Sequence, residues 1–181
     1  KLPDPKQTLP RTVALLAKLE QDKVQIGSQL YISLRGKQLA EFAMGLSRAD
    51  VPMTPDTMMI WFSSTKAVTA VAVAQQWERG KFDLDDSVAK YIPEFGNRGK
   101  EAVTIRHVLT HLGGFRLADG GTSSLGRTME ENLKQIYAAE LEPGWIPGRK
   151  AGYHPTSGWF ILGELVQRLS GRPRVDTRLY G

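Results

Sequence analysis

The hydrophobic periodicity of the sequence changes at residues 51–57, VPMTPDT, and this change limits the folds open to the chain. Before it, apolar residues alternate with polar ones over 29–34, which is the period of a half-buried strand. The stretch RGK at 35–37 predicts a glycine-containing turn into a second strand, and so a β-hairpin. After residue 57 the period is helical. We therefore expect a small sheet and then a helical region, with a passage between subdomains at 51–57.

Helices are predicted on both sides of the hairpin. Apolar residues at helical spacing predict an amphipathic helix from Pro10 to about Asp22, capped by Thr8. Thr128 and Glu131 have the spacing of a capping box. Further helices are expected at about 63–79, 104–111, 129–139 and 157–169, with a short one after the acidic stretch 83–87. Because two strands alone make a marginal sheet, we expect more strands from outside this sequence.

Composition and charge exclude several classes of protein. The 181 residues can bury a core, and 41% hydrophobic with 24% charged residues is typical of a soluble globular protein. The 24 Lys and Arg against 19 Asp and Glu are scattered, without the basic cluster of a nucleic-acid-binding protein. No cysteine is present, which excludes disulfides, thiolate metal sites and cysteine nucleophiles. The longest apolar run, 67–74, is far shorter than the roughly 18–20 residues of a membrane span.

A serine and a lysine stand three residues apart at the start of that apolar run. On a helix, Ser63 and Lys66 share one face. We expect the run 67–74 to be buried, and a buried lysine whose pKa falls from about 10.4 toward neutrality can take the proton of a serine hydroxyl. N–H groups at a helix start can stabilise an oxyanion. The spacing alone is weak evidence, because Ser87 and Lys90 repeat it in a polar segment. There a helix cap and a surface lysine are the better interpretation.

Three longer stretches agree in order and spacing with a known family. They are FSSTKAVTAVAVAQQWERGKFDLDDSVAKYIPEF at 62–95, VTIRHVLTHLGGF at 103–115 and PGRKAGYHPTSGWFILGELVQRLSGRP at 147–173. Together they resemble the serine β-lactamase and penicillin-binding protein superfamily, especially its class C-like branch and the related esterases. The resemblance implies an α/β (α+β) fold of the β-lactamase/transpeptidase type. Residues 1–57 would give the first helix and hairpin of the α/β subdomain, and 58–181 the helical subdomain.

The resemblance also implies roles for three residues. Ser63 would be the acylated nucleophile, Lys66 its proton partner, and Tyr153 the phenol that carries protons to the leaving group. Where the family's tyrosine element ends in Asn, this chain has Pro155, which has no side-chain donor for an amide substrate. We therefore expect a carboxylesterase acting through an acyl-enzyme. The alternatives are a β-lactamase or D-alanyl-D-alanine carboxypeptidase, and a truncated or degenerate binding module without turnover.

Further residues are candidates for substrate contact. Trp159 and Phe115 could line an acyl pocket, with core packing as the default, while substrate contact and a plain surface position are equal alternatives for His154. His107 and His111 lie one helical turn apart, but no third ligand stands nearby. We therefore expect no metal, and the resemblance implies no cofactor. The glycine-rich loop 113–124 is expected to form a lip of the cleft.

One family motif is absent from the sequence. The Lys-Thr-Gly or His-x-Gly strand, and the Ser-Asp-Asn alternative, do not occur. We therefore expect an N-terminal portion of a longer protein, and this leaves open whether the 181 residues alone are active. The missing strands would come from further sequence, from a second copy or from a complementing segment. The expected partner is a small ester or lactam, with no nucleic acid. The expected compartment is the bacterial cytoplasm, the periplasm or the extracellular space.

Overall fold

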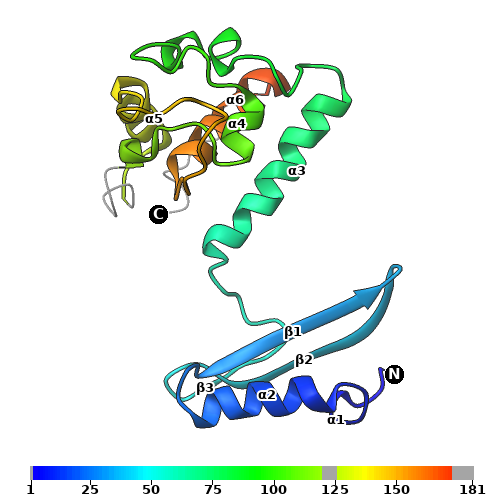
Figure 1. Cartoon of the computed structure of the whole chain (residues 1–181). Coiled ribbons are helices and arrows are strands. Elements are labelled where there is room, and N and C mark those ends of the chain that lie inside the picture. The colour runs from blue at the N-terminus through cyan, green and yellow to red at the C-terminus, as the bar shows by residue number, and fades with distance from the viewer. Residues whose placement is uncertain (1, 120–125, 173–181) are drawn as a thin grey trace. The chain divides into compact units, whose positions relative to one another are not determined.

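The computed structural model describes residues 2–119 and 126–172, which fall into two compact units (Figure 1). The first unit is Lys1–Ile60 and the second is Trp61–Gly181. None of the described helices has both the length and the apolar character that crossing a bilayer requires.

The first unit contains the predicted helix and hairpin. Its elements are α1 (Pro5–Thr8), α2 (Pro10–Gln21), β1 (Gly27–Leu34), β2 (Lys37–Arg48) and β3 (Val51–Pro52). The strands form one antiparallel sheet in the order β1-β2-β3. Arg35 and Gly36 both have positive φ, 51° and 76°, as a two-residue type I′ hairpin turn requires. The predicted hairpin and its turn are confirmed.

Two details of this unit differ from the prediction. Thr8 ends the short helix α1, which Asp4 caps by accepting a hydrogen bond from the N–H of Lys6 at 2.9 Å. Helix α2 therefore starts at Pro10 without the predicted side-chain cap. Residues 51–52 also pair with β2 as a short third strand, where we predicted only a connecting passage.

Hydrophobic burial is sparse in the first unit. Among its described residues only Ala40 and Met53 are buried hydrophobic side chains, while several large ones are more than half exposed. They are Leu15, Val24, Ile26, Tyr31, Leu34 and Ile60, with Met58 almost fully exposed. A three-stranded sheet with so little core gains little from hydrophobic burial.

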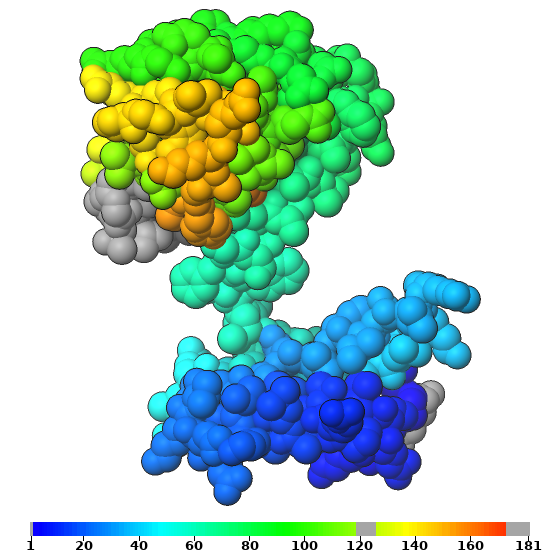
Figure 2. Space-filling model, viewed as in Figure 1, coloured from blue at the N-terminus to red at the C-terminus, as the bar shows by residue number. Residues whose placement is uncertain are grey.

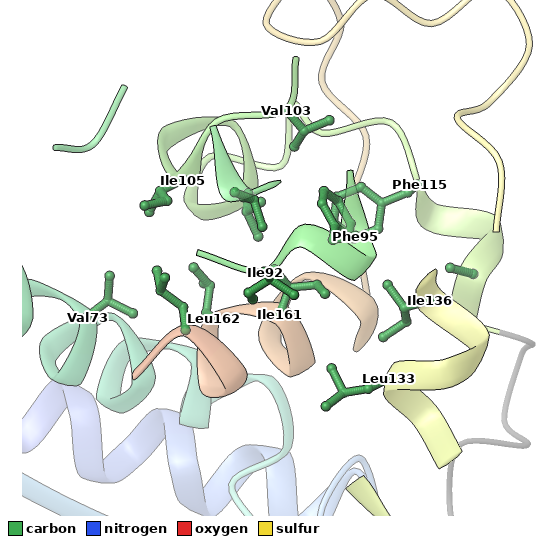
Figure 3. Close-up of a cluster of buried hydrophobic side chains, with 14 of the residues drawn as sticks. Val73, Ile92, Phe95, Val103, Ile105, Phe115, Leu133, Ile136, Ile161 and Leu162 are labelled. Carbon is green, nitrogen blue, oxygen red and sulfur yellow. The ribbon is translucent and has the colours of Figure 1, made fainter. Parts of the chain in front are cut away.

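The second unit is built around one central helix. Helix α6 (Ser157–Ser170) packs against α3 (Thr65–Glu78), α4 (Ile105–Leu109) and α5 (Met129–Ala138). The core between them includes the buried side chains of Ile92, Phe95, Phe115, Ile161 and Leu162 (Figure 3). The described residues of the unit also form the 3₁₀ turns η1 (Phe62–Ser64), η2 (Val88–Lys90), η3 (Pro93–Phe95) and η4 (Arg116–Asp119).

The predicted helices of this unit are confirmed, with small shifts at their ends. The first begins as the 3₁₀ turn η1, so Ser63 precedes the α-helix rather than lying in its first turn. Thr128 and Glu131 form the expected capping box, each side chain accepting a hydrogen bond from the other's backbone N–H. Gly171 ends α6 with φ of 66°, a left-handed conformation that glycine adopts easily.

Helix α3 is less buried than its composition suggests. Val73 is buried, but Val68 and Val71 are 55% and 59% exposed. The teal surface of the second unit in Figure 2 belongs to this helix. The prediction that the run 67–74 is buried is therefore wrong for the described residues, because only one side of α3 packs on α6.

The central position of α6 leads to a prediction about stability. Ile161 is fully buried in the core, so Ile161→Ala should lower the free energy of unfolding by about 2–5 kcal/mol. Leu117→Ala, at a residue that is 75% exposed, should change it by less than about 0.5 kcal/mol. Urea unfolding followed by circular dichroism measures both. Equal effects of the two substitutions would contradict this description of the core.

Candidate functional site

The backbone turns sharply just before Ser63. Phe62 has a positive φ of 45°, which is rare for a bulky residue and occurs where surrounding structure holds it. The turn starts η1, whose Ser64 N–H donates to the Trp61 carbonyl at 3.0 Å. The N–H of Ser63 itself donates to no residue that the structure describes. Ser63 thus presents both a hydroxyl and a free N–H at the start of α3.

Three functional groups meet at the Ser63 hydroxyl. The Lys66 ammonium donates to Ser63 Oγ at 3.0 Å, and Ser63 Oγ lies 2.5 Å from Tyr153 Oη. Lys66 Nζ also donates to the Pro155 carbonyl at 2.7 Å and lies 5.0 Å from the ring centroids of Tyr153 and Trp159. Within the described part of the chain, Lys66 forms no ion pair with a carboxylate. The arrangement is an alcohol, an amine and a phenol in mutual contact.

The electrostatics of this cluster favour ionisation of the phenol. The pKa of Tyr153 lies below its usual value of about 10. The largest cause is the hydrogen bond with Ser63, and the hydrogen bond and charge of Lys66 come next. The lowering makes the phenolate more accessible at a given pH. Nearby, burial and then the Lys66 charge lower the pKa of His111 below the ordinary value for histidine.

Helices α3 and α6 are tied together directly beside the cluster. The indole N–H of Trp159 donates to the Lys66 carbonyl at 3.2 Å. Trp159 lies in the first turns of α6, a few residues after Tyr153 and Pro155. This bond therefore fixes the helix that carries Lys66 relative to the segment that carries the phenol.

A largely apolar cavity of about 540 Å³ opens beside Ser63, a volume in the range of small-molecule sites. Ser63 and Lys66 contribute to its wall, and Gly163 and Met129 also line it. The other lining residues are Phe62, Thr65, Thr69, Pro155, Thr156, Trp159 and Phe160. The predicted substrate residue Trp159 therefore lies at the site.

The other two predicted substrate residues do not line this cavity. His154 and Phe115 are fully buried, and the Phe115 N–H donates to His154 Nε2 at 3.3 Å. Their rings pack 4.7 Å apart because the loop at 113–115 folds over the segment that follows Tyr153. The prediction of substrate contact for these two side chains is corrected, since both belong to the packed interior.

The second Ser-x-x-Lys sequence has a different environment. Ser87 Oγ accepts from the Ala89 N–H at 3.2 Å and donates to the Glu101 carbonyl, while Lys90 pairs with Asp86 at 2.8 Å. The interpretation as a cap and a surface lysine is confirmed.

The two histidines considered for metal binding make protein contacts instead. His107 Nδ1 accepts from the Thr104 N–H at 3.2 Å, and His111 Nδ1 accepts from the His154 N–H at 3.1 Å. Across the described ranges, no three potential metal ligands cluster. Of the predicted lip 113–124, residues 120–124 lie outside the described residues, and Arg116–Asp119 form η4.

Sequence reasoning missed three contributors to the site. His111 contacts both backbone neighbours of Tyr153; the sequence drew attention to its spacing to His107 and did not indicate these two bonds. Pro155 lacks a side-chain donor but its carbonyl accepts from Lys66. Gly152 lies so close to Trp145 and Arg116 that a Cβ there would approach their side chains to 2.7 and 2.9 Å. Only the tertiary structure reveals these contacts.

Comparison with known proteins identifies the family of the chain. The family model described as Beta-lactamase matches residues 14–176. The chain is 33% identical to Esterase/beta-lactamase LipL of Mycobacterium tuberculosis over 84% of its own length and 35% of the relative's. It is 32% identical to Esterase EstB of Burkholderia gladioli, over 82% of this chain and 42% of the relative. The chain thus spans less than half the length of these curated relatives.

Solved structures show the same fold. A family VIII carboxylesterase matches 99% of this chain and 48% of its own, with a TM-score of 0.76 and 25% identity. A penicillin-binding protein homolog from Caulobacter crescentus matches 94% of this chain and 46% of its own, also with a TM-score of 0.76 and 25% identity. The predicted β-lactamase/transpeptidase-like α+β fold is confirmed, and this chain matches part of it.

The lowered pKa of Tyr153 can be tested by substitution. Ser63→Ala removes the largest cause of the lowering and Lys66→Met removes the next, so each should raise the pKa of Tyr153 toward its usual value. Ultraviolet absorbance of tyrosinate during alkaline titration measures it, with a Tyr153→Phe variant subtracted for the other tyrosines. Ser87→Ala and Lys90→Met serve as matched controls and should leave Tyr153 unchanged. The described contacts would be contradicted if the pKa of Tyr153 were the same in the Ser63→Ala and Lys66→Met variants as in the wild type.

Proposed function

The chain belongs to the beta-lactamase family, and from this premise we propose that it is a serine hydrolase that forms an acyl-enzyme on Ser63. The observation that carries the proposal is the contact of Ser63 Oγ with Lys66 Nζ at 3.0 Å and with Tyr153 Oη at 2.5 Å. A serine hydroxyl needs a neighbouring base to become a strong nucleophile. Both groups that could serve are in hydrogen-bond contact with it.

Acylation uses the serine hydroxyl, the phenol and the lysine together. Ser63 Oγ attacks the ester carbonyl carbon while its proton passes to the phenolate of Tyr153, whose ionised form the Lys66 charge stabilises. When the bond from the carbonyl carbon to the alkoxy oxygen breaks, Tyr153 returns that proton to the departing alcohol. Water then attacks the acyl-enzyme with the same base, releasing the acid and restoring Ser63.

The negative oxygen of the tetrahedral intermediate requires donors. The N–H of Ser63, which donates to no described residue, is available at the start of α3, where the helix dipole adds to its effect. Such donors are worth several kcal/mol to catalysis, as removal of one typically costs roughly a hundred- to thousandfold in rate.

Esters fit this site better than amides do. Pro155 supplies a carbonyl to Lys66 but has no side-chain donor for a substrate amide, and an ester has the better leaving group. Both curated relatives carry the word esterase in their names. The name of one relative also includes beta-lactamase, so hydrolysis of β-lactams or D-alanyl peptides is the second candidate. Rates on nitrophenyl esters and on a chromogenic cephalosporin distinguish the two.

The apolar cavity suits the acyl part of an ester. Gly163 lies inside α6, where glycine costs about 0.5–1 kcal/mol relative to alanine. A Cβ at this position would have only Met129 Cε within 4 Å, at 3.5 Å, an ordinary contact. Alanine would fit the fold and favour the helix. The glycine keeps space open in a cavity that includes Ser63 in its wall.

The first test of this function is covalent labelling of the folded chain by a fluorophosphonate. The wild type should react, and Ser63→Ala should lose both labelling and nitrophenyl ester hydrolysis because the nucleophile is gone. Ser87→Ala, at the other Ser-x-x-Lys sequence, should retain both. A folded wild type that does not label would favour the alternative of a binding module without turnover.

The second test concerns acyl length. Gly163→Ala should maintain or raise the free energy of unfolding, by up to about 1 kcal/mol, because the helix gains alanine. The added methyl should lower kcat/KM for nitrophenyl octanoate relative to nitrophenyl acetate by roughly tenfold, since it narrows the cavity. The acetate ester is the internal control. An unchanged ratio would show that the acyl chain binds elsewhere.

A further inference from the structure

We propose that His111 is a positioning residue that holds the Tyr153 phenol against Ser63 by binding the backbone on both sides of the tyrosine. The inference deepens the proposed function, since it concerns the geometry of the proposed proton carrier. His111 lies just after α4 and far from Ser63 in sequence, and the proposed reaction does not otherwise use it.

Two hydrogen bonds carry the inference. The Gly152 N–H donates to the His111 carbonyl at 2.9 Å, and the His154 N–H donates to His111 Nδ1 at 3.1 Å. Gly152 directly precedes Tyr153 in the sequence, and His154 directly follows it. One residue thus accepts from both neighbours of the tyrosine and fixes the backbone from which the phenol projects.

The backbone of His111 adopts a conformation that makes this double contact feasible. Its φ is 61°, in the left-handed region that non-glycine residues occupy only when surrounding structure holds them there. The Leu112 N–H donates to the His107 carbonyl at 2.7 Å and closes the turn after α4. In this turn both the carbonyl and the imidazole of His111 reach the segment 152–154.

The imidazole ring also contacts the side chains of the cluster. The centroid of the imidazole ring lies 4.8 Å from that of the Tyr153 ring and 5.0 Å from that of the Trp159 ring. The imidazole stacks on the indole. Trp159 in turn donates to the Lys66 carbonyl. His111 therefore contacts both the phenol and the residue that ties α6 to α3, so its loss should loosen the phenol.

The protonation state of His111 agrees with this role. Nδ1 accepts a hydrogen bond, so it carries no proton. Burial and the charge of Lys66 both lower the pKa of His111, which favours the neutral ring at neutral pH. The titratable groups that face it are Lys66 on α3 and Tyr153 and His154 before α6.

The experiment compares His111→Asn with His111→Gly. The Asn carbonyl oxygen can replace Nδ1 as an acceptor, and Asn tolerates positive φ. Glycine keeps the backbone conformation and the carbonyl that accepts from Gly152, but it removes the side-chain acceptor and the ring. Alkaline absorbance titration, with Tyr153→Phe subtracted in each background, should show that the pKa of Tyr153 stays lowered in the Asn variant and moves toward its usual value in the Gly variant. Circular dichroism checks that both are folded.

Labelling by the fluorophosphonate is the second readout. The Gly variant should react on the order of a hundredfold more slowly than wild type, because a small misplacement of a proton carrier is enough for such a loss, and the Asn variant should recover most of the rate. The proposal is overturned if the Gly variant titrates and labels like wild type, or if the Asn variant behaves like the Gly variant. If wild type itself does not label, the proposed function fails, and the titration still decides the role of His111.

Discussion

The hydrogen bond between Ser63 Oγ and Tyr153 Oη joins residues that are 90 positions apart, and the rest of the site depends on it. It requires the start of α3 and the segment before α6 to lie together. The packing of α6 in the core and the bond from Trp159 to the Lys66 carbonyl bring this about. The hydrophobic core therefore sets the distance between the Ser63 hydroxyl and the Tyr153 phenol, on which the proposed reaction depends.

The two Ser-x-x-Lys sequences of the chain have different surroundings. Ser63 and Ser87 each precede a lysine by three residues. Ser87 has its hydroxyl occupied by a backbone carbonyl and a backbone N–H, and Lys90 pairs with a carboxylate. Ser63 meets an ammonium and a phenol beside an apolar cavity. The tetrapeptide is therefore a weak predictor, and the tertiary partners decide which copy can react.

Features that depend on neighbouring residues were predictable from the sequence. The turn at Arg35 and Gly36, the capping box of α5 and the end of α6 at Gly171 all follow from local steric and hydrogen-bonding preferences. Features that depend on distant contacts were not. The burial of His154 and Phe115 and the two bonds from His111 arise where the loop at 111–115 packs on the segment 152–154. No periodicity encodes that approach, and the family resemblance implied roles for Ser63, Lys66 and Tyr153 without indicating these contacts.

The most direct test of the account is to locate the acyl group during turnover. The folded chain is mixed with a nitrophenyl ester, quenched with acid, digested and analysed by tandem mass spectrometry. The account predicts one acylated residue, Ser63, because it alone combines a hydroxyl with the contacts of Lys66 and Tyr153. An acyl group on the adjacent Ser64 or on Ser87, or hydrolysis without any acyl-enzyme, would contradict it.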